Sequence, residues 1–106
     1  MKLRELAITY FKRRGYNIEL DVIIEGMSGV QRKFDMIVSR EGEKRPVWIK
    51  DWKRTVGVNI TIGLDKASAD VGLKDPILIA NKFSDHAKAY AKRKRIDLLT
   101  SRDLIM

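Results

Sequence analysis

The chain has 106 residues, 44% of them hydrophobic and 34% charged, and its lysines and arginines exceed its acidic residues enough to give a net charge of +8. This length supports one hydrophobic core, so we expect a single domain over residues 1–106. The absence of cysteine excludes disulfides, thiol nucleophiles and thiolate-bound metals, and a lone histidine, His86, excludes a histidine-rich zinc site.

The first half of the chain predicts one helix followed by three strands. Apolar residues recur at helical spacing from Leu3 to Tyr10, which predicts an amphipathic helix over 2–14 with Gly15 as its C-terminal cap. Alternating apolar and polar residues then predict strands from Tyr16 to Glu25, over 31–39 and over 46–52. Short polar connections between these strands indicate an antiparallel meander.

The second half is predicted to alternate helices with strands. Residues 54–62 alternate like a strand but also fit a helix, and we favour a helix over about 59–72 with Asn59 as its N-cap and Gly72 as its end. Residues 76–80 predict a buried strand of parallel type, and residues 84–93 predict a helix capped by Ser84. Residues 96–99 predict a last strand, which is followed by a short helix capped by Ser101. The fold class is therefore α/β, with a mixed central sheet, the order α-β-β-β-α-β-α-β and helices on both faces.

The positive charge favours a polyanion as partner. Basic side chains are expected near the second and third strands and at the end of the first helix: Arg32, Lys33, Lys50, Lys53, Arg54, Lys12, Arg13 and Arg14. No motif for reading base edges is present, so we expect DNA to be recognised through its phosphates or its shape. The alternative is a solvated, merely basic surface.

No bilayer-spanning run or secretory leader is recognisable, so we expect a cytoplasmic protein with no membrane partner and no small-molecule substrate.

Several short segments together resemble the restriction-endonuclease-like superfamily, in particular its Mrr-type nucleases and the archaeal Holliday-junction resolvases. The resemblance covers nearly the whole chain and depends on the order and spacing of Arg14-Gly15-Tyr16, Phe34-Asp35-Met36-Ile37, Val47-Trp48-Ile49-Lys50, Ile77-Leu78-Ile79-Ala80 and Ile96-Asp97-Leu98-Leu99. It implies a nuclease fold and hydrolysis of DNA phosphodiesters, including those of branched DNA, with Mg²⁺ or Mn²⁺. Dimers are common in this group, so the resemblance also implies a homodimer.

Asp35 and Lys50 are the two residues that the resemblance assigns to catalysis. Asp35 would match the metal-binding aspartate, and Lys50 would match the lysine that orients water or stabilises developing charge. An aspartate is disfavoured inside an apolar strand, so a functional role is more expected for Asp35 than for an aspartate in a loop. The alternative is an aspartate on the exposed face of the strand that faces a nearby lysine. The family's Glu or Gln two residues before the lysine is replaced by Trp48, which offers no oxygen ligand. The sequence therefore leaves open an active nuclease and a degenerate paralogue that binds DNA or a protein partner.

Two further carboxylates are weaker candidates as metal ligands. Asp51 precedes Lys53 by two residues and so repeats the spacing, and a bulge or strand end would be needed to turn it toward Asp35. Glu5 of the first helix is the other, because some junction resolvases use a glutamate from this helix. Its alternative is a solvated residue that pairs with a neighbouring cation.

The two tryptophans share a predicted strand face with Lys50, since side chains alternate along a strand. Trp48 and Trp52 are therefore predicted to be core or subunit-interface residues, with stacking on unpaired bases as the alternative. Lys50 would then serve either as a cation in the cleft or as a cation–π partner of the indoles.

Overall fold

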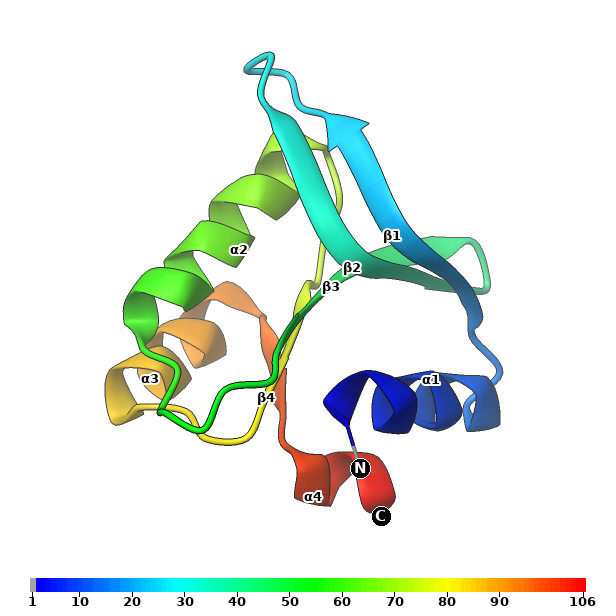
Figure 1. Cartoon of the computed structure of the whole chain (residues 1–106). Helices are drawn as coiled ribbons and strands as arrows, with labels where there is room; N and C mark the ends of the chain where they lie inside the picture. The colour runs from blue at the N-terminus through cyan, green and yellow to red at the C-terminus, as the bar shows by residue number, and fades with distance from the viewer. Residues whose placement is uncertain (1) are drawn as a thin grey trace.

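The structure is a computed structural model that describes residues 2–106 and has one five-stranded sheet with helices on both faces (Figure 1). The elements in chain order are α1 (Leu3–Arg13), β1 (Asn17–Glu25), β2 (Gln31–Arg40), β3 (Glu43–Lys50), α2 (Val58–Asp70), β4 (Ile77–Ala80), α3 (Asp85–Lys94), β5 (Asp97–Leu99) and α4 (Ser101–Ile105). The predicted fold class is confirmed. Among residues 2–106, no helix is both long and apolar enough to cross a bilayer.

The strands lie in the order β1-β2-β3-β4-β5, so β1 and β5 are the edges. β1, β2 and β3 form the predicted antiparallel meander, and β4 and β5 continue the sheet in parallel with β3. All residues of β4 are buried. A short, continuously apolar strand is typical of such a central parallel position.

Each face of the sheet is covered by two helices, and Figure 1 shows α1 on the opposite side of β4 from α2 and α3. On one face, Leu64 of α2 and Ala87 of α3 pack with Leu78 of β4 in one buried cluster. On the other face, Phe11 of α1 and Leu104 of α4 belong to a second buried cluster. The helix faces predicted from apolar spacing are therefore the faces that contact the sheet.

Several element boundaries differ from the prediction because caps depend on backbone conformation. Helix α2 begins at Val58 with Gly57 as its N-cap, so Asn59 lies inside the first turn and does not cap the helix. The terminal helix is capped by Thr100 rather than Ser101, because Thr100 and Asp103 form a reciprocal capping box. Strand β3 runs over Glu43–Lys50, which begins and ends earlier than the predicted 46–52.

The β1–β2 hairpin bends at Asp21 and Asp35. These residues lie opposite each other between two paired positions, Leu20–Met36 and Val22–Phe34. Asp21 has φ of +51°, a left-handed conformation that a non-glycine residue seldom adopts. Met36 packs in the cluster beneath α1, whereas Phe34 packs in the cluster beneath α2. The bend therefore carries the outer half of the hairpin over α2 and places two carboxylates at the bend.

Asp70, the last residue of α2, ties this helix to the turn of the hairpin. Its carboxylate accepts hydrogen bonds from the Ser28 N–H at 2.9 Å, the Ser28 hydroxyl at 2.7 Å and Arg32 Nε at 2.9 Å. Its carbonyl oxygen accepts from the Met27 N–H at 2.9 Å. A Cβ atom on Gly26 would lie 1.9 Å from Asp70 Oδ2, so a larger residue there would require the carboxylate or the turn to move. We call this contact the Asp70 latch.

Candidate functional site

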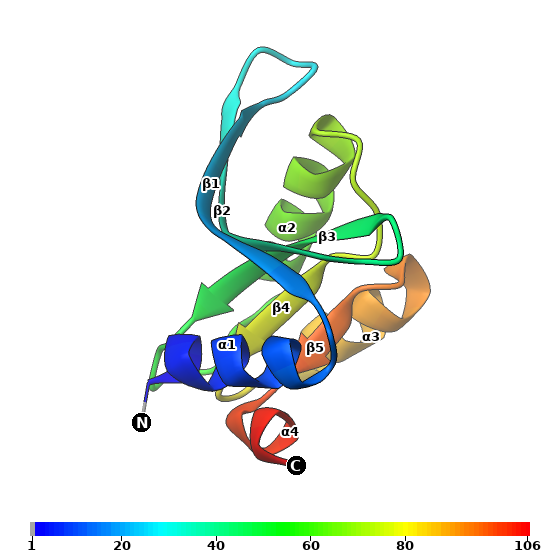
Figure 2. The same cartoon turned by 90° about the vertical axis from the view of Figure 1, so that its right-hand side faces the viewer.

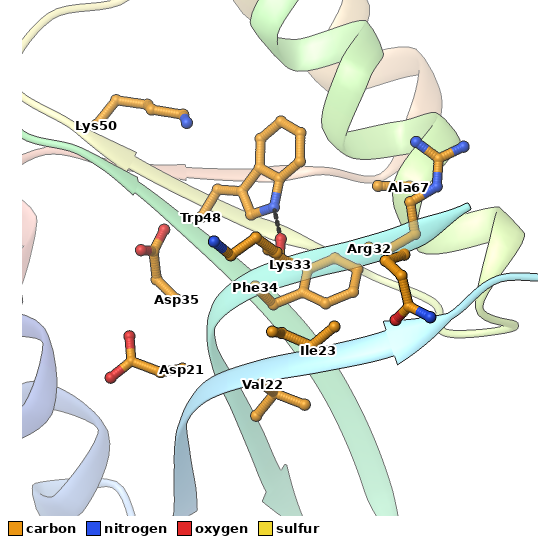
Figure 3. Close-up of a pocket in the computed structure, with 11 residues that line it drawn as sticks. Asp21, Val22, Ile23, Arg32, Lys33, Phe34, Asp35, Trp48, Lys50 and Ala67 are labelled. Carbon is orange, nitrogen blue, oxygen red and sulfur yellow. Dashed lines mark hydrogen bonds between the residues drawn. The ribbon is translucent and has the colours of Figure 1, made fainter.

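A cleft with a volume of about 730 Å³ lies where β2 separates from β3. The two strands pair only as far as Met36 and Val47, and from Val47 onward β3 pairs with β4 instead. The cleft is lined by residues of β1, β2 and β3 and by Ala67 of α2 (Figure 3). Asp35 and Lys50 both line it, so the side chains that the sequence pairs across two strands share one cavity.

Beyond Met36 and Val47, where the backbone hydrogen bonds between β2 and β3 end, the side chain of Asp35 links the two strands. Its Oδ2 accepts a hydrogen bond from the main-chain N–H of Ile49 at 2.7 Å. Within residues 2–106, the other carboxylate oxygen has no hydrogen-bond partner. The carboxylate is therefore fixed in direction and keeps one oxygen for a ligand.

The ammonium of Lys50 lies between two indole rings. Its Nζ is 4.9 Å from the ring centroid of Trp48 and 5.7 Å from that of Trp52, within the range of cation–π attraction. Figure 3 shows the Lys50 side chain reaching toward the Trp48 ring. In the described part of the chain, Lys50 forms no ion pair with Asp35. The ammonium of Lys50 could therefore bind a phosphate without first breaking an ion pair with a carboxylate of residues 2–106.

Trp48 forms a wall of the cleft. Its indole N–H donates to the Lys33 carbonyl oxygen at 2.9 Å, and a Cβ built on Gly63 of α2 would lie 3.5 Å from its ring. The indole thus bridges the separated strands β2 and β3 and packs on α2. It occupies the sequence position at which the resemblance predicts a carboxylate or carboxamide.

Asp21 is a cleft residue that the sequence interpretation missed. It lines the same cavity as Asp35 and forms an ion pair with Arg4 of α1 at 2.8 Å. In the sequence it is one of the ordinary polar positions of an alternating strand, so no local signal marks it. Only the hairpin register and the left-handed backbone place it beside Asp35.

The other two candidate ligands lie elsewhere. Asp51 follows β3, where its carboxylate accepts from the Leu3 N–H at 3.2 Å and from the Asn81 amide at 3.3 Å. It therefore caps the first residue of α1, whose own N-cap, Lys2, makes no side-chain hydrogen bond. Glu5 is exposed in the first turn of α1, and neither carboxylate lines the cleft in the described part of the chain.

The predicted basic residues divide into those at the cleft and those away from it. Arg32 and Lys33 line the cleft with Lys50, although Arg32 is already paired with Asp70. Arg54 stacks on Trp52 with its Cζ 4.3 Å from the ring centroid, and it lies outside the cleft. Other predicted cations are also outside it, beyond the end of β3 or at the far end of α1: Lys53, Lys12, Arg13 and Arg14.

The cleft offers few donors for a metal ion. No group of three or more histidine or acidic residues with the spacing of a metal site occurs within residues 2–106. Asp35 and Asp21 are the carboxylates that line the cleft. Mg²⁺ at phosphoryl-transfer sites is commonly held by one or two carboxylates together with waters and the substrate phosphate. The donor set therefore fits an ion shared with a phosphate rather than an ion enclosed by protein.

Acidification below about pH 4 is expected to weaken the Asp70 latch. Hydrogen bonds from Ser28, and then the hydrogen bond from Arg32, lower the pKa of Asp70 from its ordinary value. A carboxyl group with a lowered folded-state pKa stabilises the fold above its unfolded-state pKa and loses that effect as the pH falls through the folded-state pKa. Thermal unfolding across this pH range should show wild type and Asp70→Asn converging in acid. A pH-independent difference between them would contradict this assignment.

Comparison with known proteins gives a family match, and two crystal structures are among the solved structures that resemble this chain. A model of the restriction endonuclease family Mrr_cat matches residues 1–106. The crystal structure of AF1548, a protein of unknown function, has a TM-score of 0.83 and 22% identity over 92% of this chain and 55% of that chain. The crystal structure of VC1899 from Vibrio cholerae has a TM-score of 0.70 and 12% identity over 95% of this chain and 29% of that chain.

These likenesses at low identity establish the fold and no more. The chain spans about half the length of AF1548 and less than a third of VC1899. The search among curated proteins gives no match.

Proposed function

The chain belongs to the Mrr_cat family of restriction endonucleases, and on this premise we propose that it hydrolyses DNA phosphodiesters in the cleft that contains Asp35 and Lys50. The observation that carries the proposal is that a fixed carboxylate and an ammonium, which has no carboxylate partner within residues 2–106, line the same cavity. Lys33 and Arg32 add positive charge along the cleft wall. Such a cavity suits a phosphodiester, because cations neutralise its charge while a carboxylate orients the attacking group.

Magnesium, or manganese, is part of this proposal. Asp35 would hold the ion through its free oxygen, and Asp21 would be the second carboxylate, with phosphate and water completing the coordination. Bound there, the ion supplies Lewis-acid stabilisation of the phosphate and a more acidic water.

The residues of the chain itself would have separate tasks. Lys50 would leave its position between the indoles and bind a non-bridging phosphate oxygen, which stabilises charge that develops during attack. The Ile49 N–H would keep the Asp35 carboxylate in one orientation throughout. Trp48, held by the Lys33 carbonyl oxygen, would exclude water from the base of the cleft. Together these groups position a phosphodiester without reading its sequence.

The second candidate is a degenerate paralogue that binds DNA in the same cleft without cutting it. The observation that favours it is Trp48, which fills the position of an expected oxygen ligand and leaves a divalent ion with fewer donors. A protein-interaction role through a homodimer is a further version of this candidate. Trp48 and Trp52 both pack, partly buried, against the core cluster that contains Leu64 of α2, so such an interface would use the exposed parts of these two rings.

The test is cleavage and retention of labelled duplex, single-stranded and four-way-junction DNA with Mg²⁺ or Mn²⁺. Lys50→Ala is expected to slow cleavage by on the order of 10²-fold, because it removes charge stabilisation from the cleft. It should also make the negative slope of log affinity against log salt less steep by about 0.9, which corresponds to the loss of one phosphate contact. Lys82→Ala is the matched control, since Lys82 is exposed and outside the cleft.

The other outcomes identify the alternatives. Retention of DNA by wild type without cutting in either metal would support the degenerate paralogue. Cleavage that survives Lys50→Ala but not Lys53→Ala would move the site to Asp51 and Lys53. Absence of DNA retention at low salt, together with a tight dimer, would support the protein-interaction role.

A further inference from the structure

Two arginines at the far end of α1 are stacked on tyrosines. The Cζ of Arg14 lies 3.8 Å from the ring centroid of Tyr10, and the Cζ of Arg40 lies 4.3 Å from that of Tyr16. The two arginines are also joined, because Arg40 Nη1 donates to the carbonyl oxygen of Arg14 at 2.8 Å. We call Arg14 and Arg40 the arginine pair.

A buried phenylalanine supports both tyrosine rings. Phe11 is 1% exposed and makes edge-to-face contacts with Tyr10 and Tyr16, at centroid distances of 5.2 and 5.5 Å. Gly15, with φ of +78°, turns the chain so that the Tyr16 N–H bonds back to the Phe11 carbonyl oxygen. The guanidinium groups therefore lie on a rigid aromatic base, which lowers the entropy that they would lose on binding a ligand.

The arginine pair keeps its charge available. Three other arginines, Arg4, Arg32 and Arg45, are each in an ion pair with an aspartate. Within residues 2–106, neither Arg14 nor Arg40 forms an ion pair.

Charges of both signs lie near the arginine pair: Glu41 follows Arg40 in the sequence and forms no ion pair within residues 2–106. Glu43 lies opposite Arg40 in the β2–β3 register but makes no ion pair with it in the described chain. Lys12 and Arg13 are exposed beside the arginine pair. The surface therefore keeps a net positive charge and is partly pre-organised and solvent-accessible.

We infer that the arginine pair binds the phosphate backbone of the same DNA whose scissile phosphate occupies the cleft. This inference rests on the proposed function. Planar guanidinium groups bind phosphate with paired hydrogen bonds, and stacking on a ring covers only the face of the group. Apart from the Arg40 Nη1 donor that is bonded to the Arg14 carbonyl oxygen, the N–H groups at the edges remain for a phosphate. The pair would supply affinity and orientation, and the cleft would supply the chemistry.

The lengths of two elements that join the arginine pair to the cleft indicate the scale of their separation. Arg4 contacts Asp21 at the cleft, and α1 rises about 15 Å from Arg4 to Arg14 at its usual pitch. Along β2, Asp35 and Arg40 are about 17 Å apart at the usual rise of a strand. Figure 2 shows α1 crossing the molecule from the N-terminus to the turn before β1. Phosphates of one DNA strand advance about 3.4 Å along the axis of the duplex, so with the axis along this direction the pair would contact phosphates about four or five nucleotides from the cleft.

The experiment measures binding of a labelled DNA duplex by fluorescence anisotropy over a series of salt concentrations. Removing both guanidinium groups in Arg14→Ala/Arg40→Ala should make the negative slope of log affinity against log salt less steep by about 1.8. Arg14→Lys/Arg40→Lys should keep the slope, because the charge remains, and bind several-fold more weakly, because the planar stacked fork is lost. Arg102→Ala, an exposed arginine of α4, is the matched control and should change nothing. Thermal unfolding of each variant checks that the fold is retained.

The outcomes separate this inference from the proposed function. An unchanged salt slope in the folded double alanine variant, with a less steep slope in Lys50→Ala, would overturn the arginine pair and leave the cleft intact. Lysine variants that bind like wild type would overturn the role of stacking. Loss of binding to phosphatidylserine vesicles with DNA binding unchanged would assign the pair to a lipid surface and overturn the inference. Wild type that binds no duplex at low salt would overturn both proposals.

Discussion

An Asp35→Asn variant is expected to keep its fold and to cleave DNA at least about 100-fold more slowly than wild type. Asparagine has the size of aspartate and retains a carbonyl oxygen that can accept the Ile49 N–H, so the contact between the separated strands survives. What the substitution removes is the negative charge, which the proposed reaction needs to hold a divalent ion. The measurement is the single-turnover rate of DNA cleavage, with thermal unfolding as the test of folding.

The same variant also separates chemistry from binding. Removing a carboxylate from a cleft that faces phosphate reduces like-charge repulsion, so DNA affinity without metal should stay the same or increase. Asp51→Asn is the matched control, because its carboxylate caps α1 outside the cleft. A folded Asp35→Asn variant that cleaves like wild type would exclude Asp35 from the reaction.

Gly26→Ala is expected to lower the free energy of unfolding by about 1–3 kcal/mol. The added Cβ would lie 1.9 Å from Oδ2 and 2.4 Å from Cγ of Asp70, and that carboxylate is held by Ser28 and Arg32, so either the turn or the latch must move. Denaturant unfolding measures the effect. Gly63→Ala is the matched control, because its added Cβ would be in ordinary contact with the Trp48 ring, at 3.5 Å, and alanine is favoured over glycine inside a helix such as α2.

A double-mutant cycle tests the cause of that loss. In the background of Asp70→Ala the alanine at position 26 meets no carboxylate, so its effect should shrink, and the two substitutions should not be additive. Equal effects of Gly26→Ala in both backgrounds would show that the latch is not the source. Because Arg32 lines the cleft and bonds to Asp70, a released hairpin should also alter the cleft wall.

The sequence predicted the parts of the fold that depend on local pattern. Alternation along β1 and β2 and the continuous apolar run of β4 identified their strands, because a half-buried strand and a fully buried strand impose different spacings. The cap at Thr100 was missed because Ser101 is an equally good capping residue, and only the backbone conformation decides between them.

The cleft was predictable only in part. Asp35 and Lys50 were identified from their strands and the family resemblance, and both line the cavity. Asp21 was not predicted at the cleft, because the alternation of apolar and polar residues does not reveal a left-handed backbone conformation inside a strand. The contact of Asp51 with Leu3 joins residues far apart in sequence, so no local spacing reports it. Lys53 was predicted at the cleft, but β3 ends at Lys50 and the chain turns away.

The position of the two indoles beside Lys50 has a spectroscopic consequence. Trp48 and Trp52 are the only tryptophans in the chain, and the ammonium of Lys50 lies less than 6 Å from both ring centroids. The intrinsic ultraviolet emission of this protein therefore originates almost wholly from Trp48 in the cleft wall and from Trp52, whose ring also lies near the ammonium of Lys50. The molecule contains its own optical reporter there, with no dye or label required.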